Sequence, residues 1–241
     1  MNGALLHTLF DALAWLAAGG VGFLQARSQI IPTVAQSRQM PYLAAVLFGA
    51  GLGAYIFGTA NMLLSGKMEL ARSIEGAVAG GIIAVELYKR ITGIRARTGA
   101  RFALPFAVGV AVGRIGCYLA GLDDFTYGTP TTLSWGHDFG DGIPRHPVQL
   151  YESAAMAAFA LVYLACLRNR VAYVINNGFM LAVGYYGLQR FVWEFLKPYG
   201  TILGPFSLFH ALSIALFIYA AMMIATAPES RLSNEHERAA A

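Results

Sequence analysis

The chain has 241 residues, of which 57% are apolar and only 12% are Asp, Glu, Lys or Arg. That charged share is about half the share in a typical soluble domain, and the mean hydropathy is +0.55. A soluble domain of this size could not bury so much apolar surface, so the composition argues against a soluble enzyme and a disordered chain. The net charge of +4 comes from basic residues that lie mostly between apolar runs. This pattern indicates a membrane partner rather than a nucleic acid.

Seven apolar runs predict transmembrane helices, each of which needs about 20 mostly apolar residues. The first run is the weakest because Asp11 lies inside it, and no Lys or Arg precedes Arg27, so we do not expect a cleaved signal peptide. The sequence therefore predicts an all-α integral membrane protein, with one seven-helix membrane domain over residues 1–227 and a short polar tail over 228–241. The predicted helices cover residues 8–24, 41–64, 73–90, 102–120, 148–167, 173–196 and 204–227.

The orientation follows from the positive-inside rule, by which Lys and Arg concentrate on the cytoplasmic side. The links on one side, together with the tail, carry 11 basic residues, and the links on the other side carry four. We therefore expect the N-terminus outside and the C-terminus in the cytoplasm. The basic side has Arg27, Arg38, Lys89, Arg90, Arg95, Arg97, Arg101, Arg168, Arg170, Arg231 and Arg238, and the other side has Lys67, Arg72, Arg145 and Lys197.

The longest connection covers residues 121–147 and faces outward by this count. We interpret its four aspartates, Asp124 among them, as a solvated loop surface. Where the loop meets the fifth predicted helix, several polar side chains gather at the membrane entrance. Such groups are costly there unless they serve packing or a ligand, so we consider them candidates for substrate binding. They are Arg145, His146, Gln149, Tyr151 and Glu152.

Two basic residues, Arg114 and Arg190, lie inside predicted helices. Ionisable side chains at membrane depth face protein or water rather than lipid. Tyr186 and Glu194 lie four residues either side of Arg190, so these three share a helix face. Two arginines with few obvious partners leave positive potential in an apolar bundle, and the guanidinium fork suits a phosphate. One hypothesis is a phospholipid head-group site open to the outer face, and the other is a salt-bridge network that only joins helices.

Other residue types in the sequence bear on the site that these charges suggest. Gly113 and Gly116 flank Arg114 and allow close helix approach, which leaves room for the guanidinium and a ligand. Glu75 opens the third predicted helix and is either a general base or a helix-cap residue. We interpret Cys117 as a small buried hydrophobic residue rather than a nucleophile. Neither the two cysteines nor the five histidines, which form no close pair, indicate a metal site, so no metal is expected.

Residues 145–152 read Arg-His-Pro-Val-Gln-Leu-Tyr-Glu, and residues 113–116 read Gly-Arg-Ile-Gly. Together with residues 73–81 and 186–194, these segments resemble the bacterial prolipoprotein diacylglyceryl transferases. The most specific is residues 145–152, which match the family's Arg-His-Pro-x-Gln-Leu-Tyr-Glu string almost letter for letter. Residues 113–116 resemble its Gly-Arg-x-Gly signature, with Gly128 similar to a later loop glycine. Residues 186–194 resemble its Tyr-Gly-x-x-Arg-x-x-x-Glu helix, and the glycine-rich run 73–81 resembles the segment that opens its third span.

The resemblance implies an activity. Members of this family transfer a diacylglyceryl group from phosphatidylglycerol to the signal-peptide cysteine thiol of a prolipoprotein, and glycerol phosphate leaves. The reaction occurs at the outer side of the bacterial cytoplasmic membrane and uses no cofactor. By the same resemblance Arg114 and Arg190 are the catalytic phosphate-handling pair. Because the acceptor thiol must lose a proton, Glu75 and His146 are the candidate bases. The residues expected to bind substrate or orient Arg190 are Arg145, Gln149, Tyr151, Glu152, Tyr186, Glu194, Gly113, Gly116 and Gly128.

Two departures from the family fall near the acceptor chemistry. Glu75 stands where the family usually has a histidine, and Cys117 stands where it usually has an asparagine. They leave open a lipid-modifying paralogue with another acceptor, or a non-catalytic phospholipid-binding or transport protein of the same fold. A seven-helix retinal receptor is disfavoured because all three lysines (Lys67, Lys89 and Lys197) flank the predicted helices.

Overall fold

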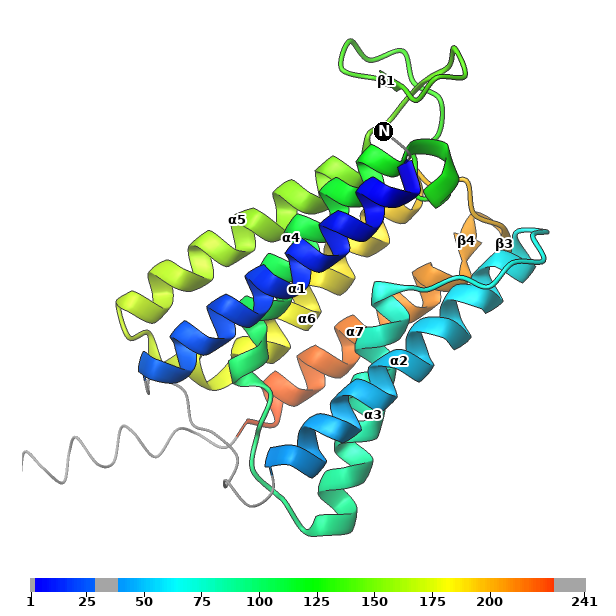
Figure 1. Ribbon diagram of the computed structural model, residues 1–241. Coiled ribbons are helices and arrows are strands. Elements are labelled where there is room, and N and C mark those ends of the chain that lie inside the picture. Colours follow the sequence, from blue (N-terminus) through cyan, green and yellow to red (C-terminus); the bar gives the residue numbers. More distant parts are fainter. Residues whose placement is uncertain (1–2, 29–38, 228–241) are drawn as a thin grey trace, which may run out of the picture.

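The computed structural model describes residues 3–28 and 39–227 (Figure 1). Seven α-helices coincide with the seven predicted apolar runs, with ends that differ by a few residues. They are α1 (Gly3–Ser28), α2 (Gln39–Leu64), α3 (Ile74–Thr92), α4 (Ala103–Ala120), α5 (Val148–Arg168), α6 (Ala172–Glu194) and α7 (Leu208–Ala225). Arg38 and the predicted polar tail lie outside the described residues.

The connections hold short regular elements. Two 3₁₀ turns flank α4, namely η2 (Ala100–Phe102) and η3 (Gly121–Asp124). In the long loop, β1 (His137–Asp138) pairs antiparallel with β2 (Pro144–Arg145). Before α7, β3 (Thr201–Leu203) pairs antiparallel with β4 (Phe206–Ser207).

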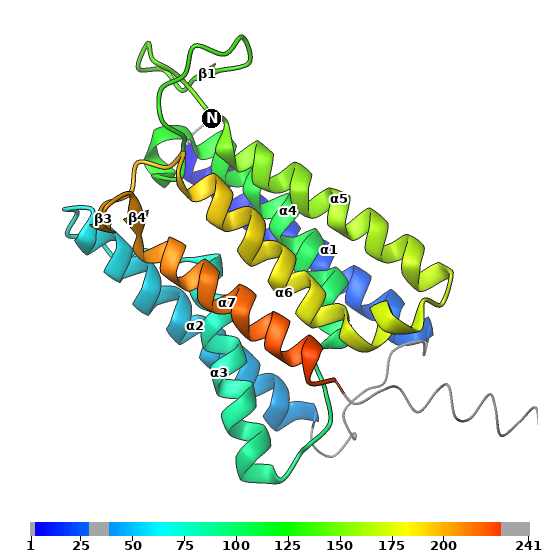
Figure 2. The ribbon, with the colours of Figure 1, turned by 180° about the vertical axis from the view of Figure 1, so that it is seen from behind.

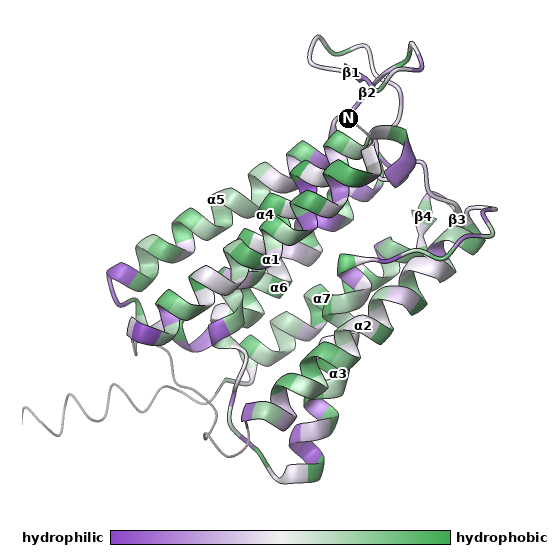
Figure 3. Ribbon diagram, in the orientation of Figure 1, coloured by the Kyte–Doolittle hydropathy of each residue, from purple (hydrophilic) through white to green (hydrophobic). Residues whose placement is uncertain are grey.

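Five helical segments in the described part of the chain are long and apolar enough to cross a membrane. They contain α1, α2, α4, α5 and α7. Helices α3 and α6 are not among them, because α3 carries four charged residues and α6 carries Arg190, Glu194 and several amides. The helices consist mostly of hydrophobic residues (Figure 3). Many of their large apolar side chains are exposed; Trp15 is 73% exposed and Phe48 is 72% exposed. An apolar exterior of this kind fits a membrane protein.

The helices form two groups. Helix α4 lies at the centre of the first group and packs against α1, α5 and α6. Helices α2 and α3 pack against each other in the second group, and α7 joins the groups through contacts with α6 and α3 (Figures 1 and 2).

The segment between α2 and α3 folds back along α2. Ser73 donates its backbone N–H to the carbonyl of Ala54 (3.0 Å), and its side chain accepts a hydrogen bond from Gly76 N and so caps α3. Ala54 is ten residues before the end of α2 at Leu64, which corresponds to about 15 Å of helix. Helix α3 therefore begins beside the middle of α2, and Glu75 in its first turn lies at that depth.

Glycines on both helices allow α2 and α3 to touch. A Cβ added to Gly53 would lie 2.3 Å from the carbonyl oxygen of Gly76, and one added to Gly80 would lie 2.2 Å from that of Gly49. Real Cβ atoms do not approach backbone this closely, so any side chain there would separate the helices. The α2–α3 pair thus depends on these four glycines.

We expect Gly53→Ala to destabilise the protein, because overpacking a tight contact costs about 1–3 kcal/mol. At about 2–4 °C per kcal/mol for a chain of this size, the Tm in detergent should fall by several degrees. Gly51→Ala is the matched control, since it lies in the same helix and a Cβ there meets nothing within 4 Å. Equal Tm values for the two variants would contradict the close contact.

Candidate active site

Six charged side chains, three basic and three acidic, meet inside the bundle, and none of them is more than 6% exposed. We call them the buried charge cluster. They come from α3, α4, α5, α6 and the turn after α6. The members are Arg114, Arg190, Lys197, Glu75, Glu152 and Glu194.

Glu152, near the start of α5, contacts all three basic members. Its Oε1 accepts hydrogen bonds from Arg190 Nη1 and from Lys197 Nζ (2.7 Å for the lysine). Its Oε2 lies 2.5 Å from Arg114 Nε, an ion pair in which the N–H is not aligned for a hydrogen bond. One carboxylate thus bridges the two arginines.

Arg190 contacts all three carboxylates of the cluster. In addition to its bond with Glu152, its Nε donates to Glu75 Oε2 (3.2 Å), and its Nη2 lies 3.0 Å from Glu194 Oε2. For Glu75 and Glu194, the carboxylate oxygen that does not contact Arg190 accepts a hydrogen bond from a serine. Ser213 donates to Glu75 Oε1 (2.5 Å), and Ser207 donates to Glu194 Oε1 (2.8 Å). The orientation of the Arg190 side chain is therefore fixed from three sides.

From the sequence we expected Arg114 and Arg190 to have few partners and to leave excess positive potential. The charges of the cluster are instead balanced. Three carboxylates oppose three cations, so the formal charges cancel when all six groups are ionised. The expectation was wrong because Glu75 and Glu152 come from other helices, 115 and 38 positions away from Arg190 in sequence. Helical spacing reveals only Glu194, four residues along the same helix.

An apolar cavity of about 430 Å³ lies between the two helix groups. Its lining comes mostly from α1, α2, α3 and α4 and includes small and aliphatic side chains such as those of Ala14, Ala50 and Val78. Ile74 and Gly113 in its lining are the chain neighbours of Glu75 and Arg114. The cavity therefore runs beside the buried charge cluster.

Residues 8–226 match the family of prolipoprotein diacylglyceryl transferases. The chain belongs to this family. Its relatives named phosphatidylglycerol–prolipoprotein diacylglyceryl transferase include one from Geobacter sulfurreducens, 32% identical over 188 residues (72% of this chain, 70% of the relative). Those from Cupriavidus metallidurans and Methylococcus capsulatus are 30% identical over 195 residues (74% and 70%) and 31% identical over 205 residues (80% and 76%). No solved structure matches the chain. Membership makes the protein a transferase of lipoprotein biosynthesis.

The residues of the family string at 145–152 lie in two separate parts of the structure. Glu152 lies in the buried charge cluster, whereas Arg145, His146 and Tyr151 lie where the loop meets α5. Arg145 pairs with Asp141, and this hydrogen bond lowers the pKa of the Asp141 carboxyl. His146 Nδ1 lies 3.4 Å from the Tyr151 hydroxyl. No hydrogen bond or ion pair among the described residues joins these three side chains to the cluster.

The family glycines serve packing more than ligand contact. A Cβ on Gly116 would lie 2.5 Å from Phe10 Cβ of α1, and one on Gly128 would lie 2.3 Å from the carbonyl oxygen of His146. Gly113 is different because it lines the cavity. The sequence predicted all three as substrate-binding, and only Gly113 has a position that fits this role.

Several buried polar atoms lack a hydrogen-bond partner among the described residues. They include the Tyr186 hydroxyl and both amide atoms of Gln149 and of Gln189. Tyr186 lies one helical turn before Arg190, and Gln149 lies one turn before Glu152. A buried polar group without a partner costs about 1–3 kcal/mol, so these atoms favour a polar ligand near the cluster.

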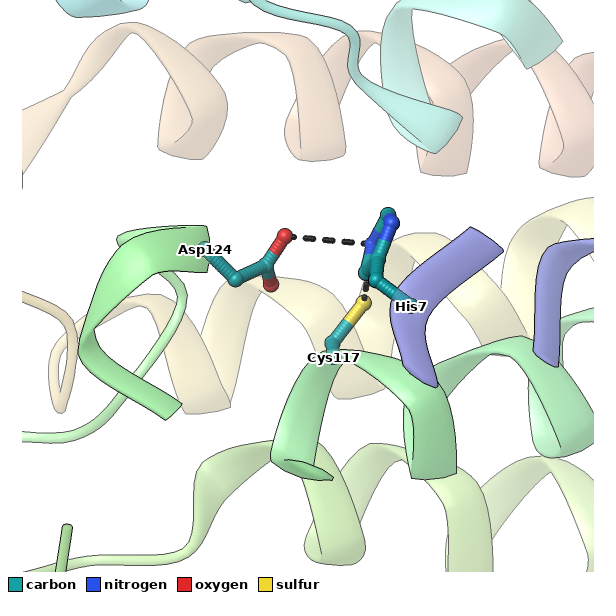
Figure 4. Close-up of side chains that lie close together, drawn as sticks. All are labelled: His7, Cys117 and Asp124. Carbon is teal, nitrogen blue, oxygen red and sulfur yellow. Dashed lines mark hydrogen bonds and ion pairs between the residues drawn. The ribbon is translucent and has the colours of Figure 1, made fainter. Parts of the chain in front are cut away.

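The sequence reasoning missed two features. Lys197, counted as an outer-loop residue, is buried against Glu152, and its spacing of three from Glu194 was the available signal. His7, Cys117 and Asp124 lie close together although they are far apart in sequence (Figure 4). These three offer the types of atom that bind metal ions.

We expect Glu152→Gln to lower the Tm by about 10 °C, because removing one partner of a buried ion pair costs about 3–5 kcal/mol. Thermal unfolding of the purified protein in detergent measures this change. Glu69→Gln is the control, since Glu69 is exposed in the segment between α2 and α3. A Tm for Glu152→Gln equal to that of the control would show that the bridging carboxylate adds no stability.

Proposed function

We propose that this protein transfers the diacylglyceryl group of phosphatidylglycerol to the cysteine thiol of a prolipoprotein signal peptide and releases glycerol phosphate. The observation that carries the proposal is the convergence of two buried arginines, from α4 and α6, on one carboxylate beside an apolar cavity. The names of the curated relatives support the same reaction.

The donor lipid fits this arrangement in two parts. Its acyl chains occupy the apolar cavity, and its phosphate lies between Arg114 and Arg190. Because Glu152 bridges these guanidinium groups, the phosphate has to displace it from at least one of them. Glu152 keeps Lys197 as a partner after this exchange. The phosphate thus replaces one anion by another and leaves no arginine without a partner.

The chemical step breaks the bond between the glycerol carbon and a phosphate oxygen, and it forms a bond between that carbon and the acceptor sulfur. Negative charge grows on the leaving phosphate, and fixed guanidinium groups stabilise it best where water is excluded. The thiol proton must leave as the sulfur attacks. Glu75 and His146 remain the candidate bases, although Glu75 already accepts hydrogen bonds from Arg190 and Ser213.

The site faces the outer side of the bacterial cytoplasmic membrane, and all seven helices cross this membrane. The basic bias of the links supports an outward N-terminus and a cytoplasmic C-terminus. The cluster lies near the loop 121–147, because Glu194 ends α6 and Glu152 lies near the start of α5. Because the loop 121–147 faces outward, the buried charge cluster lies near the outer surface of the membrane.

A second candidate is a phospholipid-binding protein or paralogue that does not modify a prolipoprotein. The balanced charges of the cluster favour it, because a network of paired charges can also exist only to join helices. Such a protein would keep bound phosphatidylglycerol and yet fail to transfer a diacylglyceryl group to a lipobox peptide.

Arg114→Ala and Arg190→Ala should each abolish transfer, measured by mass spectrometry of a lipobox peptide incubated with phosphatidylglycerol and purified enzyme. Loss of a charge-assisted contact in the transition state costs several kcal/mol, which corresponds to a rate decrease of about 100-fold or more. Lys should restore activity only in part, since it lacks the guanidinium fork. Arg90→Ala, at an exposed position of α3, is the control. Near-normal transfer rates in both folded Ala variants would contradict phosphate binding by the arginines. Only their role in joining helices through salt bridges would then remain.

Glu75→Gln should retain the fold and bound lipid but lose transfer, because the amide keeps the size and some hydrogen bonds of the carboxylate. Glu75→His should keep part of the activity. Transfer rates and bound phosphatidylglycerol are measured on the same preparations. If Glu75→Gln transfers as fast as the parent, the carboxylate only positions Arg190.

Cysteine labelling tests the orientation. A membrane-impermeant maleimide added to intact cells should label Leu133→Cys, in the loop before α5, but not Arg95→Cys, in the link before α4. Both positions are exposed, and the parent gives the background from its two cysteines. The reverse pattern would overturn the proposed orientation.

A further inference from the structure

Three side chains from separate segments meet at the end of the bundle that carries the long loop. His7 comes from α1, Cys117 from the last turns of α4 and Asp124 from η3 (Figure 4). One donor atom of each lies within 4.8 Å of the other two. His7 Nε2 is 3.2 Å from Asp124 Oδ1 and 3.7 Å from Cys117 Sγ.

These separations match the edges of a tetrahedral zinc site. With Zn–N and Zn–O bonds of about 2.0–2.1 Å and a Zn–S bond of about 2.3 Å, neighbouring N and O ligands lie about 3.3 Å apart, and N and S ligands lie about 3.6 Å apart. The two separations from His7 thus have the lengths of edges of such a site, and the donor atoms of Asp124 and Cys117 lie within 4.8 Å of each other. A thiolate with an imidazole and a carboxylate is also a ligand set that suits zinc.

Neighbouring polar groups lie behind two of the three side chains, those of His7 and Asp124. The other ring nitrogen of His7, Nδ1, lies 3.6 Å from Asp11 Oδ2. Thr126 donates to Asp124 Oδ2, the oxygen that faces away from His7. Carboxylates and hydroxyls behind metal ligands fix ring orientation and raise ligand basicity. The close contact of Gly116 with Phe10 holds α1 against α4 and keeps His7 beside Cys117.

We propose that His7, Cys117 and Asp124 bind one zinc ion, and that the fourth coordination position takes the acceptor cysteine of the peptide as a thiolate. Three protein ligands with one open position characterise catalytic rather than structural zinc. The side chains of His7 and Asp124 are 23% and 16% exposed, which gives access from outside, while Cys117 is buried. The second half of this proposal rests on the transferase reaction proposed above.

The position of the site suits that reaction. Arg114 Nη1 lies 3.8 Å from Cys117 Sγ, so zinc bound there would lie next to a guanidinium that handles the donor phosphate. A thiol bound to zinc loses its proton to solvent and remains nucleophilic.

Metal content tests the first half of the proposal. The full-length protein in lipid nanodiscs is stripped with a chelator, reloaded with zinc and analysed by elemental mass spectrometry. We expect one zinc per chain in the parent and in Cys166→Ser, and none in Cys117→Ser. Asp11→Asn removes the carboxylate behind the second ring nitrogen, together with its exposed ion pair to Arg72, and should weaken zinc binding about tenfold. Zinc content that is equal in Cys117→Ser and Cys166→Ser would overturn the site, as would a zinc-free parent.

Cobalt substitution tests the open position. The cobalt-loaded parent should show a sulfur-to-cobalt charge-transfer band and the intense visible bands of four-coordinate cobalt, and Cys117→Ser should show neither. A lipobox peptide with cysteine should strengthen the charge-transfer band, whereas the same peptide with serine should not. An unchanged spectrum with the cysteine peptide would overturn thiol binding.

The two proposals can fail separately. Transfer by the metal-stripped protein at the rate of the reloaded protein would overturn the zinc role and leave the transferase intact. The opposite result, one zinc and peptide-sensitive cobalt bands but no transfer with any donor lipid, would overturn the transferase and confirm a thiol-binding metal site.

Discussion

The half of the molecule that carries the long loop depends on the bridging carboxylate of Glu152. Burying six charges is costly, and the loss of hydration is offset only where each charge has a close partner of opposite sign. Glu152 supplies such a partner to Arg114, Arg190 and Lys197 together. Helices α4, α5 and α6 must therefore approach at one point, which limits how they can pack elsewhere.

The need of each buried charge for a close partner also explains why α3 begins beside the middle of α2. Arg190 needs a carboxylate on the side away from α5, and Glu75 reaches it because the preceding segment folds back along α2. The glycine contacts between α2 and α3 then hold this first turn in place. A helix that began level with the end of α2 would place Glu75 about 15 Å away, beyond the reach of any side chain. The fold-back and the glycines thus serve the charge cluster.

Local patterns in the sequence predicted a large part of this arrangement. Apolar runs predicted all seven helices, and five of these, within the described residues, are long and apolar enough to cross a membrane. The two arginines and Glu194 stood out as charges inside those runs. The pairing of Glu75 and Glu152 with Arg190 could not be predicted, since it depends on which helix faces which. For the burial of Lys197, its spacing of three from Glu194 was the available signal. The cluster of His7, Cys117 and Asp124 was missed for the same reason, as His7 and Cys117 are 110 positions apart.

The contacts on the two sides of the cavity differ greatly in strength. On the side of α6, Glu75 and Arg190 join the helix groups through a bond that is almost wholly buried. On the side of α1, Asp11 and Arg72 join them through an ion pair at 3.6 Å whose side chains are 39% and 61% exposed. Exposed pairs contribute about 0–1 kcal/mol, whereas breaking a buried pair costs about 3–5 kcal/mol. Separation between α1 and the α2–α3 pair is therefore the less costly way to open the cavity, because it leaves the bond between Glu75 and Arg190 intact.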